Sequence, residues 1–425
     1  MAHLLMIESW VGGTGRIFPP AIARLGHRYT FVTRNRGHYQ DPRSREIHPV
    51  IEHAENVLSF DTNDTTALVE FLRAQHEVLK FDGVVTICDY YIGTVAEVAQ
   101  ALNLPQAFSD NVVMERRKDL VREAIERAFL PNPKFAVAGE WEQVRTEAAR
   151  IGYPLVVKPT DLASSAFVKL VRDEAQLRES FDALAAFPRN FREQARVPLL
   201  LLEEFMDGEE ISVEACTYRG RTTVIGITDK SLTGFPYFIE DGHMFPARLD
   251  PQLAQQVEAL VRGALAAVGH DHGLSHTEVK LTSKGPRIVE INPRPGGNYI
   301  AELIQRATGI DLLDAQIELA LGREPDLQRR DTGVASAAIK FVVPPRAGRA
   351  LALDGADALD ADPNVARWSL AAVAGTEVSA PIDNACYLGH VIATDAHGLD
   401  ARAHAERAVA GLRLRYADET IAPAA

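Results

Sequence analysis

Two acidic residues, an asparagine and an arginine are spaced along a segment whose pattern predicts a β-hairpin. In residues 276–292, two runs of alternating apolar and polar residues flank a short glycine-containing turn. If this turn is centred on Lys284, Glu278 lies directly opposite Glu290, and Asn292 projects from the same face. The other face is expected to be buried and carries Val279, Leu281, Val289 and Ile291.

The acidic face of this hairpin is suited to a divalent cation. Two carboxylates that face each other across a ladder destabilise it unless something neutralises them. Magnesium takes oxygen ligands, commonly one or two carboxylates together with the phosphates of a nucleotide. Asn292 adds a neutral oxygen, and Arg294 offers a planar fork that suits a phosphoryl group. For the hairpin taken alone, a solvated acidic strand face is the alternative.

The hairpin and the residues after it resemble the metal-binding end of the ATP-grasp carboxylate–amine ligases. The resemblance rests on Glu278 and on residues 290–297, which read EINPRPGG. It implies that Glu278, Glu290 and Asn292 hold two Mg²⁺ ions, or Mn²⁺ in their place, that bridge the phosphates of ATP. It also implies that Arg294 stabilises the transferring phosphoryl group and the tetrahedral intermediate.

The same resemblance places an ATP site on lysines and on a loop. Lys118 and Lys158 resemble the two phosphate-contacting lysines of the family. Lys158 has independent support because a charge that ends an apolar strand is costly unless it is paired. Ser164 and Ser165 lie where the family places a mobile phosphate loop, although that loop is normally glycine-rich. Lys230 is a further candidate phosphate ligand.

Residues 201–210 resemble the hinge that holds adenine in this family. The nucleotide-binding residues implied there are Glu203, Glu204, Phe205, Met206 and Glu210. Glu203 and the following backbone would bind the adenine edge, and Glu210 would accept the ribose hydroxyls. Without the resemblance, the segment reads as a buried edge strand that ends in a turn at residues 207–208.

Residues 239–247 (IEDGHMFPA) resemble the substrate-side loop of the L-amino-acid ligases, the dipeptide-forming branch. Residues 336–341 and 387–393 resemble two strands of that branch's capping domain. The resemblance implies that a carboxylate attacks the γ-phosphate of ATP and that an amine then attacks the acyl phosphate. Small-molecule carboxylate and amine partners follow from this reaction, and a homodimer would fit the family.

Some residues have an expected role and an equally simple structural alternative. His243 and His276 are candidates for a base that helps the amine lose a proton. A lone histidine is more often structural, and this remains the alternative for both. Gly296, Gly297 and Asn298 are expected to shape the acyl pocket, or they form a plain turn that closes the hairpin.

Regular patterns predict the elements that position these residues. Strand patterns at 3–7, 29–33 and 83–87 alternate with helix patterns at 18–25, 65–75 and 93–102, which predicts a parallel sheet covered on both faces. One amphipathic helix is expected over 112–128. Further patterns predict strands at 154–158 and 167–171, a helix from 174, an antiparallel region over 199–292, helices over 303–321 and a helix at 401–412.

These elements predict an α/β chain of three units. We expect residues 1–110 to form a Rossmann-like parallel domain, and the resemblance implies that residues 111–325 form a two-lobed ATP-grasp domain. Its small lobe covers 111–198 and its large lobe 199–325. Residues 326–425 form a C-terminal capping subdomain.

A glycine turn after the first strand raises a competing interpretation. Residues 12–15 read GGTG and resemble a dinucleotide site, with Arg34 and Arg36 near a 2′-phosphate. That pattern requires glycine at position 18, where Phe18 stands, so an NADP oxidoreductase is disfavoured. An ATP-grasp carboxylase or purine-pathway-type enzyme that activates bicarbonate or formate remains an alternative. A non-catalytic nucleotide-binding regulator is another, although it would be expected to lose metal ligands or lysines.

Composition limits the compartment and the partners. The 425 residues are too many for one ordinary core. The net charge of −13, with no basic tract, argues against nucleic acid as the main partner. No signal-peptide pattern and no apolar run of membrane-spanning length is visible. The three cysteines suit neither a disulfide framework nor a zinc site, and we expect a reducing cytoplasm and no membrane partner.

Overall fold

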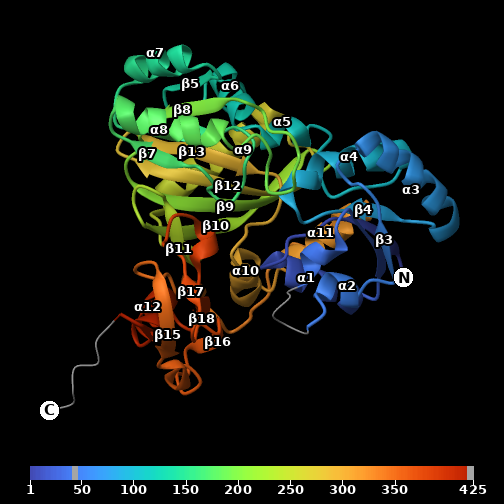
Figure 1. Ribbon diagram of the computed structural model, residues 1–425. Coiled ribbons are helices and arrows are strands. Elements are labelled where there is room, and N and C mark those ends of the chain that lie inside the picture. Colours follow the sequence, from blue (N-terminus) through green and yellow to red (C-terminus); the bar gives the residue numbers. More distant parts are fainter. Residues whose placement is uncertain (41–45, 419–425) are drawn as a thin grey trace.

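Three regions follow one another along the chain, coloured blue, green to yellow, and orange to red in Figure 1. The computed structural model describes residues 1–40 and 46–418, so residues 419–425 of the predicted C-terminal unit lie outside this part. None of the helices in these residues is both long and apolar enough to cross a bilayer.

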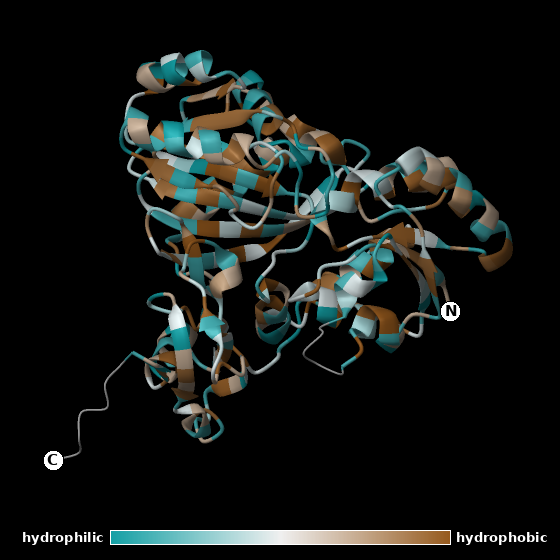
Figure 2. Ribbon diagram, in the orientation of Figure 1, coloured by the Kyte–Doolittle hydropathy of each residue, from teal (hydrophilic) through white to brown (hydrophobic). Residues whose placement is uncertain are grey.

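The N-terminal region is built on a parallel four-stranded sheet in the order β3-β2-β1-β4, as the alternating pattern predicts. Every residue of β1 is buried, which explains its largely apolar sequence. Figure 2 shows that the strands of this sheet are mostly hydrophobic. The elements of the region are β1 (His3–Ile7), α1 (Thr14–Arg24), β2 (Arg28–Thr33), η1 (Arg36–Tyr39), α2 (Pro49–Glu52), β3 (Asn56–Ser59), α3 (Thr65–Leu79), β4 (Gly83–Val85), η2 (Asp89–Tyr91) and α4 (Ile92–Leu102).

Helix α11 (Leu312–Ala320) packs against the N-terminal region, beside α1 and β4 (Figure 1). A Cβ atom at position 83 would lie 2.0 Å from the carbonyl oxygen of Ala320, so Gly83 permits this close approach. Arg24 of α1 pairs with Asp311 and Asp314 at the start of α11, at 2.9 and 2.6 Å. The predicted central unit therefore contributes one helix to the N-terminal region.

The single helix predicted over 112–128 is in fact two helices, α5 (Val112–Arg116) and α6 (Lys118–Arg127). Arg117 has an extended backbone between them, with φ −89° and ψ 103°. The amide of Lys118 donates to the carbonyl oxygen of Thr160 at 3.1 Å, which fixes the start of α6 beside the small lobe. The break also lets the Lys118 side chain enter the cavity between the lobes.

The small lobe is an antiparallel sheet in the order β5-β8-β6-β7, packed against α7 and α8. Strand β8 lies between β5 and β6, with Phe135 opposite Glu203 and Leu155 opposite Glu204. The lobe boundary predicted between residues 198 and 199 is therefore wrong by one strand, since an apolar strand pattern does not reveal which sheet it joins. The elements are β5 (Phe135–Ala138), α7 (Trp141–Ile151), β6 (Leu155–Pro159), β7 (Lys169–Val171), α8 (Glu174–Ala185) and β8 (Leu200–Glu204).

The large lobe is the first part of an eight-stranded antiparallel sheet, β13-β12-β9-β10-β11-β14-β18-β16. Apolar residues of β9, β12 and β13 pack against α6 and α9 in one cluster. Alternation turns the intervening polar residues to the opposite face, toward the small lobe. The elements are β9 (Glu209–Tyr218), β10 (Arg221–Thr233), β11 (Ile239–Phe245), α9 (Pro251–Val268), β12 (Gly273–Thr282), β13 (Gly285–Asn292) and α10 (Ile300–Thr308).

The C-terminal region extends the same sheet, because β14 pairs with β11 and β18 pairs with β14. The two strands predicted at 336–341 and 387–393 are confirmed as β14 and β18, and they lie side by side. A second small sheet has the order β17-β15-β19. The elements are β14 (Ser336–Phe341), β15 (Gly348–Asp354), η3 (Ala356–Ala358), β16 (Val365–Leu370), β17 (Glu377–Val378), η4 (Asn384–Cys386), β18 (Gly389–Asp395), α12 (Ala401–Ala410) and β19 (Arg413–Tyr416).

Candidate active site

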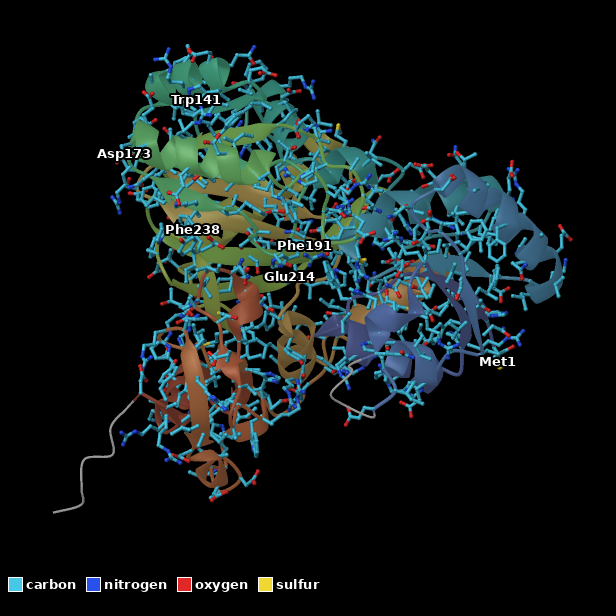
Figure 3. All side chains as sticks on the ribbon, in the orientation of Figure 1. Met1, Trp141, Asp173, Phe191, Glu214 and Phe238 are labelled. Atoms are coloured by element: carbon cyan, nitrogen blue, oxygen red, sulfur yellow. The ribbon has the colours of Figure 1, made fainter. Side chains whose placement is uncertain are left out.

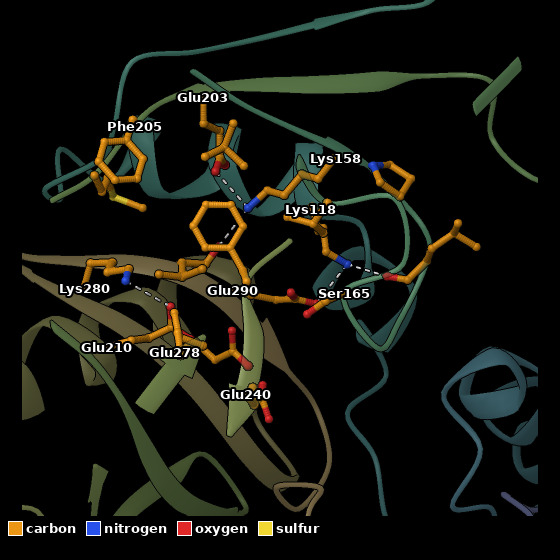
Figure 4. Close-up of a pocket in the computed structure, with 18 of the residues that line it drawn as sticks. Lys118, Lys158, Ser165, Glu203, Phe205, Glu210, Glu240, Glu278, Lys280 and Glu290 are labelled. Carbon is orange, nitrogen blue, oxygen red and sulfur yellow. Dashed lines mark hydrogen bonds and ion pairs between the residues drawn. The ribbon is translucent and has the colours of Figure 1, made fainter. Parts of the chain in front are cut away.

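A cavity of about 810 Å³ that is open to solvent lies between the small-lobe sheet and the large sheet. Figure 4 shows lysine and glutamate side chains from both lobes facing it. The predicted residues that line it are Lys118, Lys158, Ser164, Ser165, Glu203, Glu204, Phe205, Met206, Glu210, Glu278 and Glu290.

The predicted acidic pair lies at the edge of this cavity. Glu278 and Glu290 are direct partners across the β12–β13 ladder, which confirms the predicted register at this point. The register shifts between Glu278 and Val279, so Val279 pairs with Ile288. Val289, expected on the buried face, lines the cavity instead because this bulge turns it around.

Each carboxylate of the pair is neutralised by a different cation. Glu290 pairs with Lys118 at 2.9 Å, and Glu278 pairs with Lys230 at 2.8 Å. Burial would raise the pKa of Glu278, but Lys230 and His276 outweigh it and hold this pKa well below its ordinary value. Glu278 is therefore a carboxylate at neutral pH, and Glu290 has the ammonium group of Lys118 beside it.

Lys230 is placed differently from its predicted role as a phosphate ligand. It does not line the cavity, and its fully buried ammonium group contacts three carboxylates at 2.8–3.0 Å, those of Glu210, Glu240 and Glu278. Burial opposes its charge, yet these carboxylates raise its pKa well above the ordinary value. Lys230 thus acts as the counter-ion that holds three acidic side chains in position below the cavity floor.

Lys158 and Glu203 form a buried cluster with Arg122, which the sequence did not indicate. Glu203 accepts from Arg122 Nε at 2.5 Å through one oxygen and lies 2.8 Å from Lys158 Nζ through the other. Burial lowers the pKa of Lys158 in spite of its carboxylate partner. Both oxygens of Glu203 thus already have a cationic partner. An adenine edge would therefore have to bind the neighbouring backbone, or a Glu203 oxygen would have to contact adenine and its present partner together.

The hinge after β8 turns sharply into β9. Gly208 has φ +89°, and a Cβ atom there would lie 2.0 Å from the carbonyl oxygen of Leu281, so the turn requires glycine. Beyond it, Glu210 lies 3.4 Å from Lys280, a cavity-lining lysine that the sequence analysis overlooked. Lys280 stands two residues after Glu278 on the same strand, and this period-two spacing was the available signal.

The loop between β6 and β7 lacks the expected glycines but keeps a glycine-like backbone. Ser164 and Ser165 have φ values of +61° and +55°, in the left-handed region that glycine favours. Lys118 donates to the carbonyl oxygen of Leu162 in this loop at 2.7 Å. Both predicted serines line the cavity, and their role in a phosphate loop stays a prediction.

Arg294 lies just after β13 and reaches into the N-terminal region. Its Nε donates to Asp89 at 2.5 Å, and Trp10 Nε1 donates to the other oxygen of Asp89 at 3.0 Å. Burial alone would raise the pKa of Asp89, but the ion pair with Arg294 lowers it. Asp89 was not predicted as a site residue because it follows β4, some two hundred residues away in the chain.

The two candidate histidines lie close to the acidic cluster but outside the cavity wall. His276 lies 2.7 Å from Glu214 and 3.3 Å from Glu278, and these carboxylates outweigh burial and raise its pKa to about 9. Both ring nitrogens of His276 thus face carboxylates, and its role as a base stays a prediction. His243 is buried beside Glu240 at 3.3 Å.

The predicted acyl-pocket residues follow Arg294 as a tight turn. A Cβ atom at Gly296 would lie 2.9 Å from Nδ1 of His276, whereas Gly297 faces open space. Asn298 has φ +50° and donates from Nδ2 to Glu240 at 2.7 Å. The turn therefore connects the arginine, a histidine and Glu240, which the sequence analysis had not named.

Three family models match this chain, each over the region whose structure is described above. An ATP-grasp N-terminal domain matches residues 21–106, an ATP-grasp domain matches 151–302, and an L-amino acid ligase C-terminal domain 2 matches 340–417. The chain belongs to the ATP-grasp superfamily. The ATP-grasp fold predicted from the sequence is thereby confirmed.

Relatives of this ATP-grasp chain include named ligases. Human carnosine synthase 1 is 30% identical over 288 residues, which cover 64% of this chain and 34% of that protein. Alanine–anticapsin ligase of Bacillus subtilis is 26% identical over 277 residues, covering 61% of this chain and 58% of that one. This chain thus spans about a third of the length of carnosine synthase 1. These names support a ligase enzyme, as the sequence predicts.

A solved structure shares the fold over nearly the whole chain. The L-amino acid ligase of Bacillus licheniformis superimposes with a TM-score of 0.82 and 22% identity, covering 98% of this chain and 99% of that one. The superposition includes the C-terminal region, where the ligase domain model matches. This ATP-grasp chain is thus similar in architecture to an L-amino acid ligase from end to end.

The donor set at the predicted metal site fits magnesium bound together with phosphates. Among residues 1–40 and 46–418, no group of three or more His, Cys, Asp or Glu side chains is arranged to hold a metal by itself. Glu278 and Glu290 offer two hard oxygen donors at the cavity, whereas Asn292, which pairs with His276 at the end of the ladder, is not one of the residues that line it. Magnesium usually keeps waters or phosphate oxygens beside one or two carboxylates, which is compatible with this set.

Replacing Asp89 with asparagine is expected to lower kcat/KM of this ATP-grasp chain by about 10- to 100-fold through misplacement of Arg294. The amide keeps the size of the side chain but removes the charge that holds the guanidinium group. Nucleotide affinity, measured by calorimetry, should stay within about threefold of wild type. An unchanged kcat/KM would show that Asp89 does not position Arg294.

Proposed function

We propose that this ATP-grasp chain is an ATP-dependent carboxylate–amine ligase that forms an amide bond through an acyl phosphate. A carboxylate oxygen attacks the γ-phosphorus of ATP, and ADP leaves. The amine nitrogen then attacks the acyl carbon, the phosphate leaves, and the nitrogen loses a proton. The observation that carries this proposal is the opposed pair Glu278 and Glu290 beside the cavity, with Lys118 on one side and Arg294 at its end.

The residues of this chain would divide the work of binding and charge stabilisation. Lys118, Lys158 and the loop with Ser164 and Ser165 would hold phosphates, while the hinge after β8 would receive the base. Glu278, Glu290 and Asn292 would hold Mg²⁺, which supplies neutralisation of the phosphate charge when bound. Arg294 would stabilise the charge that develops on the transferring group.

The comparisons favour an amino acid as a substrate of this reaction. The C-terminal match to an L-amino acid ligase domain and the relative named alanine–anticapsin ligase support it over activation of bicarbonate or formate. Lys118, Lys158, Glu278 and Glu290 all line the cavity, and their presence argues against a regulator without catalysis. We therefore propose an amino acid as at least one of the two substrates.

The proposal is tested by measuring ADP and phosphate release with Mg–ATP across pairs of L-amino acids and small carboxylic acids, with mass detection of products. Release that needs both a carboxylate and an amine, with a product one water lighter than their sum, would support the ligase. Release driven by bicarbonate or formate would point to the alternative reaction. Binding of ATP without release on any pair would contradict the proposed activity.

Replacing Glu290 with glutamine is expected to raise the magnesium concentration for half-maximal activity by about 10- to 100-fold. Glutamine retains one oxygen donor but loses the negative charge that attracts the ion and pairs with Lys118. The measurement is a magnesium titration of ADP release at saturating ATP. Glu318→Gln, a change on α11 outside the cavity, serves as the control. A titration identical to wild type would remove Glu290 from the metal site.

A further inference from the structure

A loop of the small lobe reaches away from the nucleotide cavity and docks on the N-terminal region. Residues 189–195, here called the docking loop, lie between α8 and β8. Asn190 organises the loop, because its Oδ1 accepts from the amides of Arg192 at 2.8 Å and Gln194 at 3.1 Å. Figure 3 places Phe191 between the central and N-terminal regions. The docking loop is thus a compact projection that is held together by hydrogen bonds between its own residues.

Arg192 is the centre of the contact. Its side chain is 6% exposed, and its Nη2 donates to the carbonyl oxygen of Ser9. The guanidinium group also lies 5.6 Å from the ring centre of Trp10 and 5.9 Å from that of Tyr39. A planar, weakly hydrated cation suits this aromatic environment better than an ammonium group does. A buried arginine between two aromatic rings is a specific contact, unlike an exposed ion pair.

The surface that receives Arg192 begins at an anchored residue, Glu8. Glu8, just before Ser9, is buried with φ +53°. Its carboxylate accepts from Thr62 at 2.8 Å and from Tyr39 at 2.6 Å, as well as from the amide of Arg34 at 2.7 Å. A non-glycine residue in this conformation is held there by its surroundings. Glu8 is therefore anchored, whereas Ser9 and Trp10, which follow it, contact Arg192 through a carbonyl oxygen and a ring.

The docked surface continues directly to the catalytic arginine. Trp10 donates to Asp89, which pairs with Arg294. Gln194 of the docking loop donates to the carbonyl oxygen of Tyr90 at 3.1 Å. The amide of Ala163, in the phosphate loop, donates to the hydroxyl of Tyr90 at 3.4 Å. The turn η2 is thus touched by the docking loop, the phosphate loop and Arg294.

We propose that the docking loop couples two features of the molecule, with Arg192 as the positioning residue. One is the position of the small lobe over the nucleotide, and the other is how well ordered the hydrogen-bonded residues Trp10, Asp89 and Arg294 are. This inference rests on the proposed function in one respect, namely that a nucleotide binds in the cavity. A nucleotide held by both lobes favours the docked arrangement, and docking in turn fixes the turn that holds Arg294. Such coupling is reciprocal. If the loop is undocked, nucleotide binding should therefore no longer make the N-terminal region more ordered.

The experiment is hydrogen exchange with and without a non-hydrolysable Mg–ATP analogue, on wild type, Arg192→Ala, Arg192→Lys and Arg178→Ala. Arg178 is the matched control, since it lies 4.8 Å over the Trp141 ring and pairs with Asp182 within the small lobe. In wild type and the control, the analogue should slow exchange at least about fivefold in peptides 156–171 of the cavity and in 8–16 and 86–92 of the N-terminal region.

In Arg192→Ala the protection should remain in the cavity peptides and be lost in the N-terminal ones, while affinity for the analogue stays within about threefold. Arg192→Lys, which keeps the charge but not the planar stacking, should lie between the two. A merely structural role would change stability without separating the two sets of peptides. Should Arg192→Ala fail to fold, Gln194→Ala, which removes the contact with Tyr90 and one bond to Asn190 within the loop, should weaken the N-terminal protection.

Equal N-terminal protection in wild type and Arg192→Ala would overturn the proposal. So would wild-type protection confined to the cavity, which would leave the proposed function intact. If calorimetry detects no binding of the analogue to the wild type, both this proposal and the proposed function fail.

Discussion

Replacing Arg294 with alanine is expected to lower kcat by about 10³-fold or more while Mg–ATP binding stays largely intact. Arg294 follows directly on the strand that carries Glu290 and Asn292, and Asp89 holds its guanidinium group. Its charge would act mainly on the charge that develops during phosphoryl transfer, and such interactions affect kcat more than ground-state binding. The measurement is ADP release under saturating substrates, with the nucleotide affinity from calorimetry.

Two further variants separate this effect from a loss of folding. Arg294→Ala leaves Asp89 buried without its main partner, so the melting temperature of each variant has to be compared with wild type. Arg24→Ala removes an arginine that also bridges regions through carboxylates but lies far from the cavity lining. It should retain most activity. A folded Arg294→Ala with kcat within about tenfold of wild type would contradict the role proposed for Arg294.

Replacing Glu203 with alanine is expected to lower the free energy of unfolding by about 3–5 kcal/mol. Glu203 is the shared partner of Arg122 and Lys158, and all three side chains are at most 5% exposed. Without Glu203, two buried cations face each other with no carboxylate between them. Urea denaturation of the nucleotide-free protein measures the loss.

The neighbouring residue supplies the control for this prediction. Glu204→Ala changes a half-buried side chain on the same strand and should cost about 1 kcal/mol or less. The pKa of Glu203 lies below its ordinary 4.5, because Arg122 and Lys158 outweigh burial. Its contribution is therefore present above about pH 4.5 and is lost as pH falls through the lowered value. If Glu203→Ala and Glu204→Ala had the same free energy of unfolding, the cluster of Glu203, Arg122 and Lys158 would not make the proposed contribution to stability.

The register of the acidic hairpin could be predicted because two simple rules act together there. A glycine-containing turn fixes which residues are opposite, and the alternation of side chains fixes which share a face. This placed Glu278 opposite Glu290, as the structure has it. The bulge after Glu278 could not be predicted, since nothing in the local pattern marks the extra residue that turns Val289 toward the cavity.

Residues that act across the lobes were the ones that sequence reasoning missed. Arg122 lies on an amphipathic helix, where an arginine looks solvated, yet it is buried against Glu203. Asp89 looks like an ordinary residue after a strand until the fold brings it to Arg294. Glu240 lies three residues before His243, which the sequence analysis named, but only the structure shows that Glu240 forms an ion pair with Lys230. Each of these depends on tertiary contacts that local spacing does not encode.

Local patterns also failed where tertiary contacts overrode them. The amphipathic pattern over 112–128 continues through Arg117, but the bond from the Lys118 amide to Thr160 breaks the helix there. Strand β8 has the apolar pattern of any buried strand, and only its pairing with β5 and β6 assigns it to the small lobe. Periodicity identifies an element, whereas its neighbours decide where the element breaks and which sheet it joins.

The central claim, transfer of phosphate to a carboxylate before amide formation, is tested most directly with oxygen-18. The carboxylate of the acyl donor is labelled, and the released phosphate and the amide product are analysed by mass spectrometry. The account predicts one labelled oxygen in the phosphate for each amide formed, because the oxygen that attacks phosphorus leaves with it. Label found in AMP, with pyrophosphate as the other product, or phosphate that carries no label would contradict the acyl-phosphate mechanism.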